Sequence, residues 1–322
     1  MSAVAAAVDR WTEREACDRL ALESPHGSVF CRPDFLDALD RPWELWGGPP
    51  GAGGFAALLF READGSVARG PLPFTMYQGL LGPPESDPVP SHRRIRAHLD
   101  GVAALLDGLA SQGALSFCLH PRFDDLRPLS WFNYDRPDQG AFAIEVRYTG
   151  LIELDPARGI EGLLADSRAA RRQEYRKASS RFEVRASVDL ELLDELHDRT
   201  FRRQGIGRPE RQRALLRSIA AAALRSGFGE LLVAWTPDGR PASAVLALFD
   251  QCSGYYLVAA NDPEFRASGS STLLFVAAAD RCLARGVTTL DVVGMNSPGR
   301  GDFKASFGAR AVPYYQAHWC RP

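Results

Sequence analysis

Residues 230–260, with the sequence ELLVAWTPDGRPASAVLALFDQCSGYYLVAA, decide the fold. Three apolar runs lie in this segment, at 230–235, 242–249 and 254–260, and turn residues separate the first two at 237–239. Short apolar runs bounded by turn residues are typical of buried strands. The segment therefore predicts three consecutive antiparallel strands.

The elements on either side of these strands extend them into one α/β unit. Apolar residues spaced three and four apart predict helices, and short runs of apolar residues predict strands. Before the three strands we predict a strand at 182–185 and helices at 190–203 and 211–225, joined by a loop at 205–209; after them we predict a helix at 271–285, a strand at 289–293, a short helix near Phe303 and a strand toward Tyr315. A mixed, mostly antiparallel sheet flanked by helices is expected.

The first half of the chain also mixes helices and strands. The predicted elements are a helix around Phe35, a strand at 55–60, a hairpin turn at 64–66, an ordered loop at 70–90, a helix from Ser91, and strands at 115–119, 142–146 and 152–154. Turn residues at 156–159 then precede a basic helix at 160–178. Turn chemistry between two sets of elements indicates a domain junction. We therefore predict two domains, residues 1–157 and 158–322, with the basic interdomain helix in the second.

Composition is typical of a globular protein. Of the 322 residues, 45% are apolar and 24% are charged, which matches ordinary globular domains. No apolar stretch has the length of a membrane span, and the Ala-rich start lacks the basic and apolar regions of an export signal. A cytoplasmic protein with no membrane partner is expected.

Cysteines and histidines are scattered along the chain. Neither set shows the close spacing of zinc ligands or of a disulfide framework. We expect reduced thiols, ordinary imidazoles and no metal site. The residues concerned are Cys17, Cys31, Cys118, Cys252, Cys282 and Cys320, with His26, His92, His98, His120, His197 and His318.

Charge is divided unevenly between the two halves. Residues 1–150 carry 14 basic and 20 acidic side chains, whereas residues 151–322 carry 24 basic and 20 acidic ones. A local basic excess attracts a phosphate-bearing ligand, although a solvated helix face gives the same pattern. The excess is too small for a general nucleic-acid binder, so DNA is not an expected partner.

Two of the 38 basic residues are lysines, Lys177 and Lys304, and the rest are arginines. A lysine that persists in so arginine-rich a chain indicates a position where a compact ammonium is needed and a planar guanidinium does not serve. With two lysines, chance survival is the alternative explanation.

Three segments of the sequence carry a resemblance to a known family. They are residues 29–36, VFCRPDFL; residues 171–178, RRQEYRKA; and residues 299–308, GRGDFKASFG. In this order they resemble the first helix, the basic interdomain helix and the Phe-Lys segment of the Fem-like branch of the GNAT superfamily of transferases. The resemblance covers most of the chain. It implies an α/β (α+β) fold with two GNAT-like domains in tandem, the N-terminal one degenerate. The long charged coiled-coil insertion of the peptidoglycan enzymes is missing, which puts a cell-wall acceptor and their mode of tRNA contact in doubt.

The resemblance assigns a catalytic role to Lys304. In the family this lysine is implicated in stabilising the tetrahedral intermediate of acyl transfer, and a fixed ammonium aimed at a developing oxyanion suits that task. A surface lysine in a loop is the alternative. Asp291, on the preceding strand, is a candidate for orienting the lysine or accepting a proton, with a structural salt bridge as the alternative. Tyr255 and Tyr256 alternate along a strand, so one of them is expected to face the cleft as a hydrogen-bonding or proton-relaying catalytic group while the other packs in the core. We predict that Tyr256 faces the cleft.

A second set of residues is predicted to bind the donor or its phosphates. Arg168, Arg172, Arg176 and Lys177 are predicted on one face of the basic helix. The segment 266–271 lies between a strand and a long helix, where acetyltransferases place a glycine-rich coenzyme A loop at a helix N-terminus; a capped helix start is the alternative. The predicted donor-binding set is Arg172, Arg176, Lys177, Arg266, Gly269 and Ser271.

Together these features predict an N-acyltransferase without a covalent enzyme intermediate. Phe303, Asn296 and Arg300 are predicted to contact the substrate, and the acceptor is expected to be an amine of a small molecule or peptide. The favoured donor is aminoacyl-tRNA, because the Phe-Lys segment matches better than the coenzyme A loop. The alternatives are an acyl-CoA donor and a non-catalytic ligand-binding protein. No permanently bound cofactor is expected, and the oligomeric state is left open.

Overall fold

The structure is a computed structural model that describes residues 8–52, 54–84, 91–203 and 205–322. The chain forms two compact units, residues 1–147 with 313–322 and residues 148–312. The division falls inside strand β6 (Ala143–Glu153), which joins the predicted strands at 142–146 and 152–154 into one continuous strand. It therefore lies earlier than the predicted junction at 157/158. The first unit also takes in the last residues of the chain.

The first unit contains a sheet of strand order β1-β2-β3-β4 and a pair formed by β5 and β12. Strand β12 pairs antiparallel with β5 from Gln316↔Cys118 to Cys320↔Ala114. Helix α3 contributes Val102, Leu105, Leu106 and Leu109 to the core of this unit. The elements are β1 (Asp9–Arg10), α1 (Arg14–Glu23), α2 (Pro33–Leu36), β2 (Trp43–Gly47), β3 (Ala56–Phe60), β4 (Leu80–Leu81), α3 (Ser91–Leu109), β5 (Ala114–Cys118), α4 (Arg127–Ser130) and β12 (Arg310–Cys320).

Several predictions for the first half are confirmed. The helix from Ser91 and the strand at 55–60 correspond to α3 and β3. The hairpin turn is confirmed by a bridge between Arg61 and Val67. The loop predicted at 70–90 contains the short strand β4, and its residues 85–90 lie outside the described part of the chain.

Two histidines of the first unit, the buried His26 and the half-buried His120, have strongly lowered pKa values. Burial lowers the pKa of His26 to about 4, with smaller contributions from His98 and Arg122. Burial likewise lowers the pKa of His120 to about 3, helped by His26 and Arg122. His26 accepts a hydrogen bond at Nδ1 from the amide of Gly82 (3.1 Å). Both imidazoles are therefore held in the neutral form when the protein is folded.

We expect the free energy of unfolding to fall as the pH drops from about 7.5 to 5. An unfolded histidine takes up a proton near its ordinary pKa of about 6.5, whereas folded His26 and His120 stay neutral, so the unfolded state binds more protons. Each buried histidine then costs about 1.4 kcal/mol per pH unit below that value. Urea unfolding between pH 5 and 7.5 measures this slope. His26→Asn keeps an acceptor near Nδ1 and should reduce the slope by the contribution of one histidine; an unchanged slope would contradict the assignment.

The second unit is built around a sheet of strand order β6-β11-β10-β9-β8-β7. Its pairs are antiparallel apart from β10 with β11, which run parallel. The three strands predicted at 230–260 are confirmed as β8, β9 and β10. The elements are α5 (Gly159–Asp166), α6 (Ala169–Ser179), β7 (Glu183–Ser187), α7 (Leu190–Arg202), α8 (Glu210–Arg225), β8 (Gly229–Trp235), β9 (Pro241–Phe249), β10 (Ser253–Asn261), α9 (Ser270–Ala284), β11 (Thr289–Asp291) and α10 (Pro298–Ala305).

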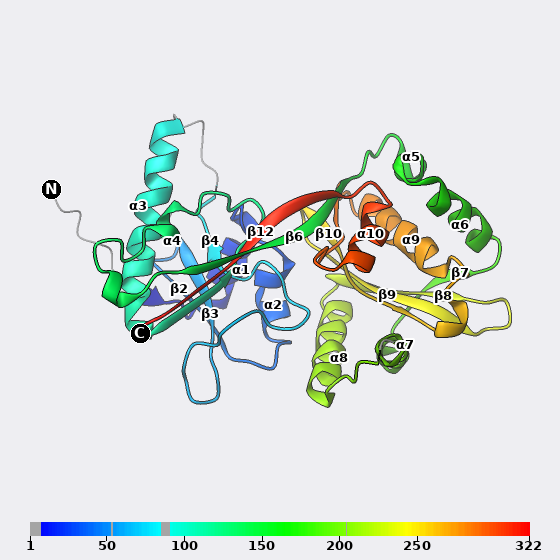
Figure 1. The fold of residues 1–322 in the computed structure, drawn as a ribbon, viewed down its shortest axis with the longest axis horizontal. Helices are drawn as coiled ribbons and strands as arrows, with labels where there is room; N and C mark the ends of the chain where they lie inside the picture. Colours follow the sequence, from blue (N-terminus) through cyan, green and yellow to red (C-terminus); the bar gives the residue numbers. More distant parts are fainter. Residues whose placement is uncertain (1–7, 53, 85–90, 204) are drawn as a thin grey trace. The chain divides into compact units, whose positions relative to one another are not determined.

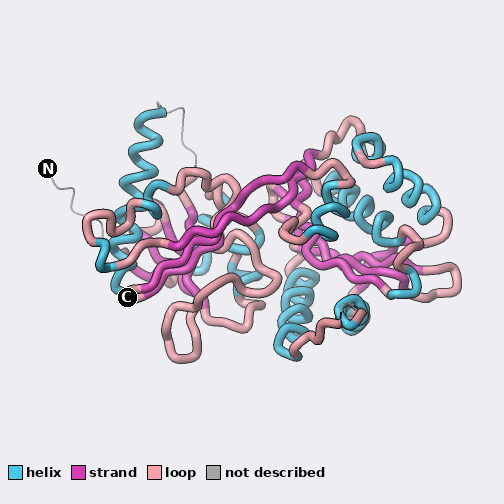
Figure 2. The backbone as a smooth tube through the Cα atoms, in the orientation of Figure 1, coloured by secondary structure: helices cyan, strands magenta, loops and turns pink. Residues whose placement is uncertain are grey.

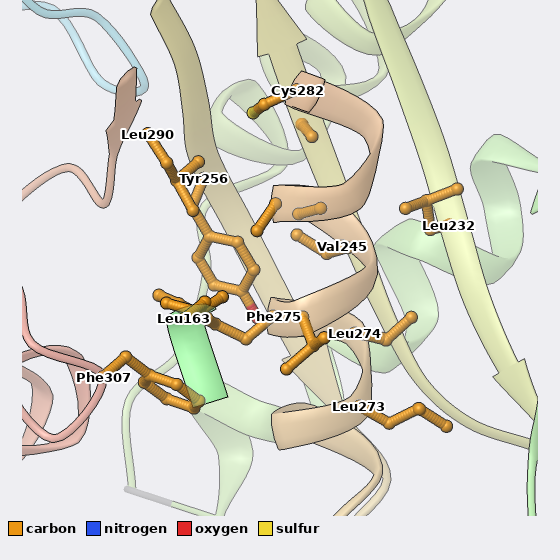
Figure 3. Close-up of a cluster of buried hydrophobic side chains, with 14 of the residues drawn as sticks. Leu163, Leu232, Val245, Tyr256, Leu273, Leu274, Phe275, Cys282, Leu290 and Phe307 are labelled. Atoms are coloured by element: carbon orange, nitrogen blue, oxygen red, sulfur yellow. The ribbon is translucent and has the colours of Figure 1, made fainter. Parts of the chain in front are cut away.

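Helices cover both faces of this sheet. Helix α9 packs on β8, β9 and β10, and helices α5 and α6 pack on α9, as Figure 1 shows. Helices α7 and α8 lie on the opposite face, which the backbone in Figure 2 makes clear. The core on the α9 side contains Leu163, Tyr256, Phe275 and Phe307 (Figure 3). A sheet covered on both faces explains why β8 and β9 are apolar along nearly their whole length.

The basic helix predicted at 160–178 is two helices, α5 and α6. The chain is extended at Arg168, with φ −56° and ψ 147°. The hydroxyl of Ser167 donates to the carbonyl of Leu163 (2.7 Å), and the amide of Arg168 donates to the carbonyl of Ser306 (2.8 Å). The prediction of a single helix is therefore wrong. The amide of Arg168, which would donate within a continuous helix, donates instead to the carbonyl of Ser306, far away in the sequence.

A buried carboxylate joins α7 to α8 and the loop before it. Asp194 is 1% exposed and accepts from Arg208 (2.9 Å), whose side chain is fully buried. Arg213 (2.7 Å) and Arg217 (3.0 Å) reach its other oxygen. Although burial alone would raise the pKa of Asp194, these arginines hold it below its usual value. The helix pair is thus held by one charge shared among three partners.

Two absences hold for the described residues. Within these ranges no helix is both long and apolar enough to cross a membrane. Nor do three or more His, Cys, Asp or Glu side chains gather there in a way that could hold a metal ion.

Candidate functional site

Lys304 lies in the last turn of α10 and is half-buried. Its ammonium donates to the carbonyls of Val293 and of Gly294, the latter at 3.1 Å. Burial lowers the pKa of Lys304 to about 8; Arg300 lowers it further, and Asp291 opposes the shift. The alternative of a loose surface lysine is therefore wrong, since the ammonium is fixed by two carbonyl oxygens.

The two carbonyls belong to a turn with unusual backbone angles. Val293 has φ +49° and Gly294 has φ +61°. The left-handed region is easily reached by glycine, but it is an outlier for a β-branched residue such as valine. Strained backbone of this kind tends to occur at functional sites. Nothing in the sequence pattern marked Val293, because its angle is set by tertiary contacts.

Asp291 ends strand β11 and is 2% exposed. Its Oδ1 accepts from the amide of Val293 (2.8 Å) and from the hydroxyl of Thr149 on β6. It also favours the charged form of Lys304. The structure thus brings Asp291 and Lys304 together as predicted, and it adds Thr149, which no sequence signal indicated.

The predicted substrate residues surround this turn. Asn296 accepts from the amide of Tyr148 (2.8 Å) and donates to its carbonyl (3.0 Å), so its amide already serves the backbone of β6. Arg300 is exposed on α10. Phe303 is half-buried, stacks edge-on against Phe307, and lies under the guanidinium of Arg171 at 5.2 Å. Their contact with a substrate stays a prediction.

Tyr256 does not face an open cleft. It is 3% exposed and packs in the core against Phe275, with ring centroids 4.9 Å apart (Figure 3). Burial raises its pKa. Tyr255 is also buried, and its hydroxyl donates to Asp250 (2.7 Å). The expectation that one of the two faces a cleft is wrong, because helices cover both faces of β10.

The basic residues of α6 do not form the predicted single row. Arg168 precedes the helix and pairs with Asp302 (2.7 Å). Arg172 folds back onto the carbonyls of Ala165 and Ser167 at the end of α5. Arg176 and Lys177 are exposed. Arg168 is exposed as well, although it is paired with Asp302, and the exposure of these three cations suits a large anionic partner.

The predicted phosphate loop is packed against α6. Gly269 has φ +84°, and a Cβ there would lie 2.9 Å from the carbonyl oxygen of Glu174. Backbone conformation and close packing against α6 therefore explain why this residue is glycine. The hydroxyl of Ser271 accepts from Asn261 (2.6 Å). Arg266 is exposed. A role for these residues in phosphate binding stays a prediction.

A carboxylate of the protein lies at the N-terminus of α9. Glu174 accepts from the hydroxyl of Thr272, the third residue of α9, at 2.6 Å, and pairs with Arg171 at 2.7 Å. Anions are stabilised at this end of a helix. Glu174 belongs to the segment 171–178, but nothing in the sequence of that segment indicated that its carboxylate would lie at the start of α9.

The site can supply a fixed cation and a nearby carboxylate. A half-buried ammonium stabilises an anion far better than one in open water, because the effective dielectric constant is lower. It is held by carbonyls and needs no reorganisation to act. Such an arrangement fits reactions in which negative charge develops on a carbonyl oxygen.

Comparison with known proteins agrees with this geometry. Residues 165–305 match the family model described as an acetyltransferase (GNAT) domain, and this range includes Asp291 and Lys304. No curated protein matches the sequence.

Three solved structures show the same fold over nearly the whole chain. FemX gives a TM-score of 0.69 at 15% identity, covering 95% of this chain and 96% of that one. The C-terminal domain of a putative lysylphosphatidylglycerol synthetase from Agrobacterium fabrum gives 0.52 at 13% identity, covering 95% and 90%. A tandem GNAT protein from the clavulanic acid biosynthesis pathway, solved without AcCoA, gives 0.53 at 11% identity, covering 98% of each. The predicted tandem GNAT-like fold is confirmed: residues 165–305 match a GNAT domain, and nearly the whole chain shares its fold with FemX and with the tandem GNAT protein.

Proposed function

We propose that this GNAT-type N-acyltransferase transfers an aminoacyl group from aminoacyl-tRNA to an amine of a small molecule or peptide. The observation that carries the proposal is the ammonium of Lys304, fixed by the carbonyls of Val293 and Gly294 beside the buried Asp291. Both aminoacyl-tRNA and its alternative, acyl-CoA, are cytoplasmic substrates, so we place the reaction in the cytoplasm.

The proposed reaction proceeds by direct attack of the acceptor amine. The amine nitrogen forms a bond to the ester carbonyl carbon, and the carbonyl oxygen becomes negatively charged beside Lys304. The bond from that carbon to the ribose oxygen of the tRNA then breaks, and the proton lost by the amine passes to the leaving oxygen. An oriented cation at the oxyanion supplies several kcal/mol in related reactions. Asp291 keeps Lys304 charged and aimed.

The N-terminus of α9 favours this donor over acyl-CoA. A pyrophosphate is expected to bind the free amides and positive end of a helix, but here the side chain of Thr272 contacts an internal ion pair of Glu174 and Arg171. A diphosphate at this end of α9 would have to compete with Glu174 for the positive charge of Arg171. The fold neighbour named as a putative lysylphosphatidylglycerol synthetase gives independent support, because its named product carries an aminoacyl group.

The exposed cations of the second unit suit the tRNA. Three cations of the predicted donor-binding set are exposed: Arg176, Lys177 and Arg266. Arg172, by contrast, is held by hydrogen bonds to the carbonyls of Ala165 and Ser167. Lys and Arg neutralise phosphates and release counterions, which makes such binding sensitive to salt. We assign Arg300, Asn296 and Phe303 to the acceptor side of Lys304, on the segment that borders the turn.

Calorimetric titration with acetyl-CoA and with charged tRNA tests the donor. We expect tRNA binding that weakens as salt is raised, and no saturable binding of acetyl-CoA. In the Glu174→Gln variant, acetyl-CoA binding should become detectable, because the carboxylate that pairs with Arg171 is gone. Glu161→Gln, an exposed change on α5, serves as the matched control. Saturable acetyl-CoA binding by the unaltered protein would instead make the donor an acyl-CoA.

A further inference from the structure

The turn that holds Lys304 is fastened to β6 at both ends. The amide of Val292 donates to the carbonyl of Gly150 (2.9 Å), and the amide of Met295 donates to the carbonyl of Tyr148 (3.0 Å). The amide group of Asn296 adds two bonds to the backbone of Tyr148. Between these anchors lie the two left-handed residues at 293 and 294.

Close packing leaves this turn little room to move. A Cβ at Gly150 would lie 2.4 Å from Sδ of Met295 and 2.8 Å from Cγ2 of Val292. Glycine at 150 therefore lets the turn lie directly on β6. The approach is so close that the turn has to follow the shape of the strand.

The strained residue is held by one buried polar pair. Val293 takes a left-handed conformation that valine adopts at a cost, so its surroundings have to impose it. Its amide donates to Oδ1 of Asp291, and the same oxygen accepts from the hydroxyl of Thr149. Thr149 is fully buried and Asp291 is 2% exposed. A buried network in which each member has a partner fixes one conformation.

We propose that Thr149 is a positioning residue for Lys304. Its hydroxyl orients Asp291, Asp291 holds the amide of Val293, and the carbonyls of Val293 and Gly294 then point at the ammonium. Thr149 itself lies on β6 and acts through these groups. The proposal rests on the role given to Lys304 in the proposed function, but its physical content is the position and burial of that ammonium, which can be measured without a substrate.

The two lysines of this chain make the measurement direct. Protein labelled with [ε-¹³C]lysine gives two side-chain signals, and the signal lost in Lys304→Met is that of Lys304. The charged groups that act on Lys304 are Asp291, on β11, and Arg300, on its own helix. Because burial is the largest cause of its lowered pKa of about 8, loosening the turn should admit water and move the titration back toward the ordinary value.

Thr149→Val removes the hydroxyl and keeps the shape. We expect the Lys304 titration to move upward by about one pH unit, a tenfold change in its proton affinity. Thr149→Ser keeps the hydroxyl and should restore the original titration. Thr289→Val is the matched control, since Thr289 lies on the neighbouring strand β11 and its hydroxyl donates to Glu153 instead. It should leave the titration unchanged.

A second variant keeps the test decisive if Thr149→Val folds poorly. Val293→Gly accepts the left-handed conformation without strain, so in the Val293→Gly, Thr149→Val double variant the titration should return to near its original position. An unchanged or lower pKa of Lys304 in folded Thr149→Val would overturn the proposal. That result would not contradict the proposed function, which is tested by activity. Conversely, the titration of Lys304 can be measured even if the proposed function is wrong, because it needs no substrate.

Discussion

Replacing Lys304 by methionine should lower kcat/KM by about 10²–10³-fold, which is the usual effect of removing one oxyanion donor. Methionine has a similar length and no charge, so the fold and the affinity for tRNA should change little. Release of a labelled aminoacyl group from charged tRNA, in the presence of a mixture of small amines and peptides, measures the effect. Lys304→Arg should show a similar loss of kcat/KM, because a planar guanidinium does not reproduce the hydrogen bonds of the ammonium to the carbonyls of Val293 and Gly294.

The control for this experiment is Arg310→Met, an exposed change at the start of β12. Its activity should match that of the unaltered protein. If neither the unaltered protein nor the Lys304 variant shows turnover with charged tRNA or acyl-CoA, the protein is a ligand-binding protein with a GNAT-like fold and the enzymatic proposal fails. Full activity in Lys304→Met would place the oxyanion stabilisation elsewhere.

Replacing Asp194 by alanine should lower the free energy of unfolding by about 3–5 kcal/mol, because removing one partner leaves a buried charge uncompensated. Arg208 has a fully buried side chain and pairs with this carboxylate. Arg213 and Arg217 are partly exposed and can turn to water. Urea unfolding followed by circular dichroism measures the change.

Glu195→Ala provides the matched control on the same helix. Glu195 pairs with Arg199 at the surface, and exposed pairs of this kind contribute at most about 1 kcal/mol. The Asp194→Ala, Arg208→Met double variant should recover part of the lost stability, since it removes the charge that was left without a partner. A loss below about 1 kcal/mol for Asp194→Ala would mean that the ion cluster does not hold α7 to α8.

The sequence predicted the elements whose identity depends on local pattern. The strands at 230–235, 242–249 and 254–260 were found because a sheet covered on both faces needs apolar residues along its whole length. The prediction that Tyr256 faces a cleft is wrong for the same reason, since alternation distinguishes the two faces of a strand but does not show whether either face is open. The break between α5 and α6 depends on the carbonyl of Ser306, which is distant in sequence.

The candidate site shows the same limit. Lys304 was found from its rarity and from the Phe-Lys segment. Its partners at Val293 and Thr149 carry no pattern, because a left-handed valine and a buried hydroxyl become visible when β6 and the turn lie together. Glu174 was inside a segment read as basic, and its place at the start of α9 is a matter of tertiary packing.

The division of the chain has a consequence for its synthesis. The first unit draws on residues 313–322, which emerge from the ribosome after the whole second unit. Among them, Trp319 is 2% exposed, packs on Phe132 at 5.2 Å and donates to the carbonyl of Gln139 (2.9 Å). Folding during translation proceeds from the residues already synthesised. We therefore expect the unit that begins first to be completed last, because its core lacks these residues until the second unit has been synthesised.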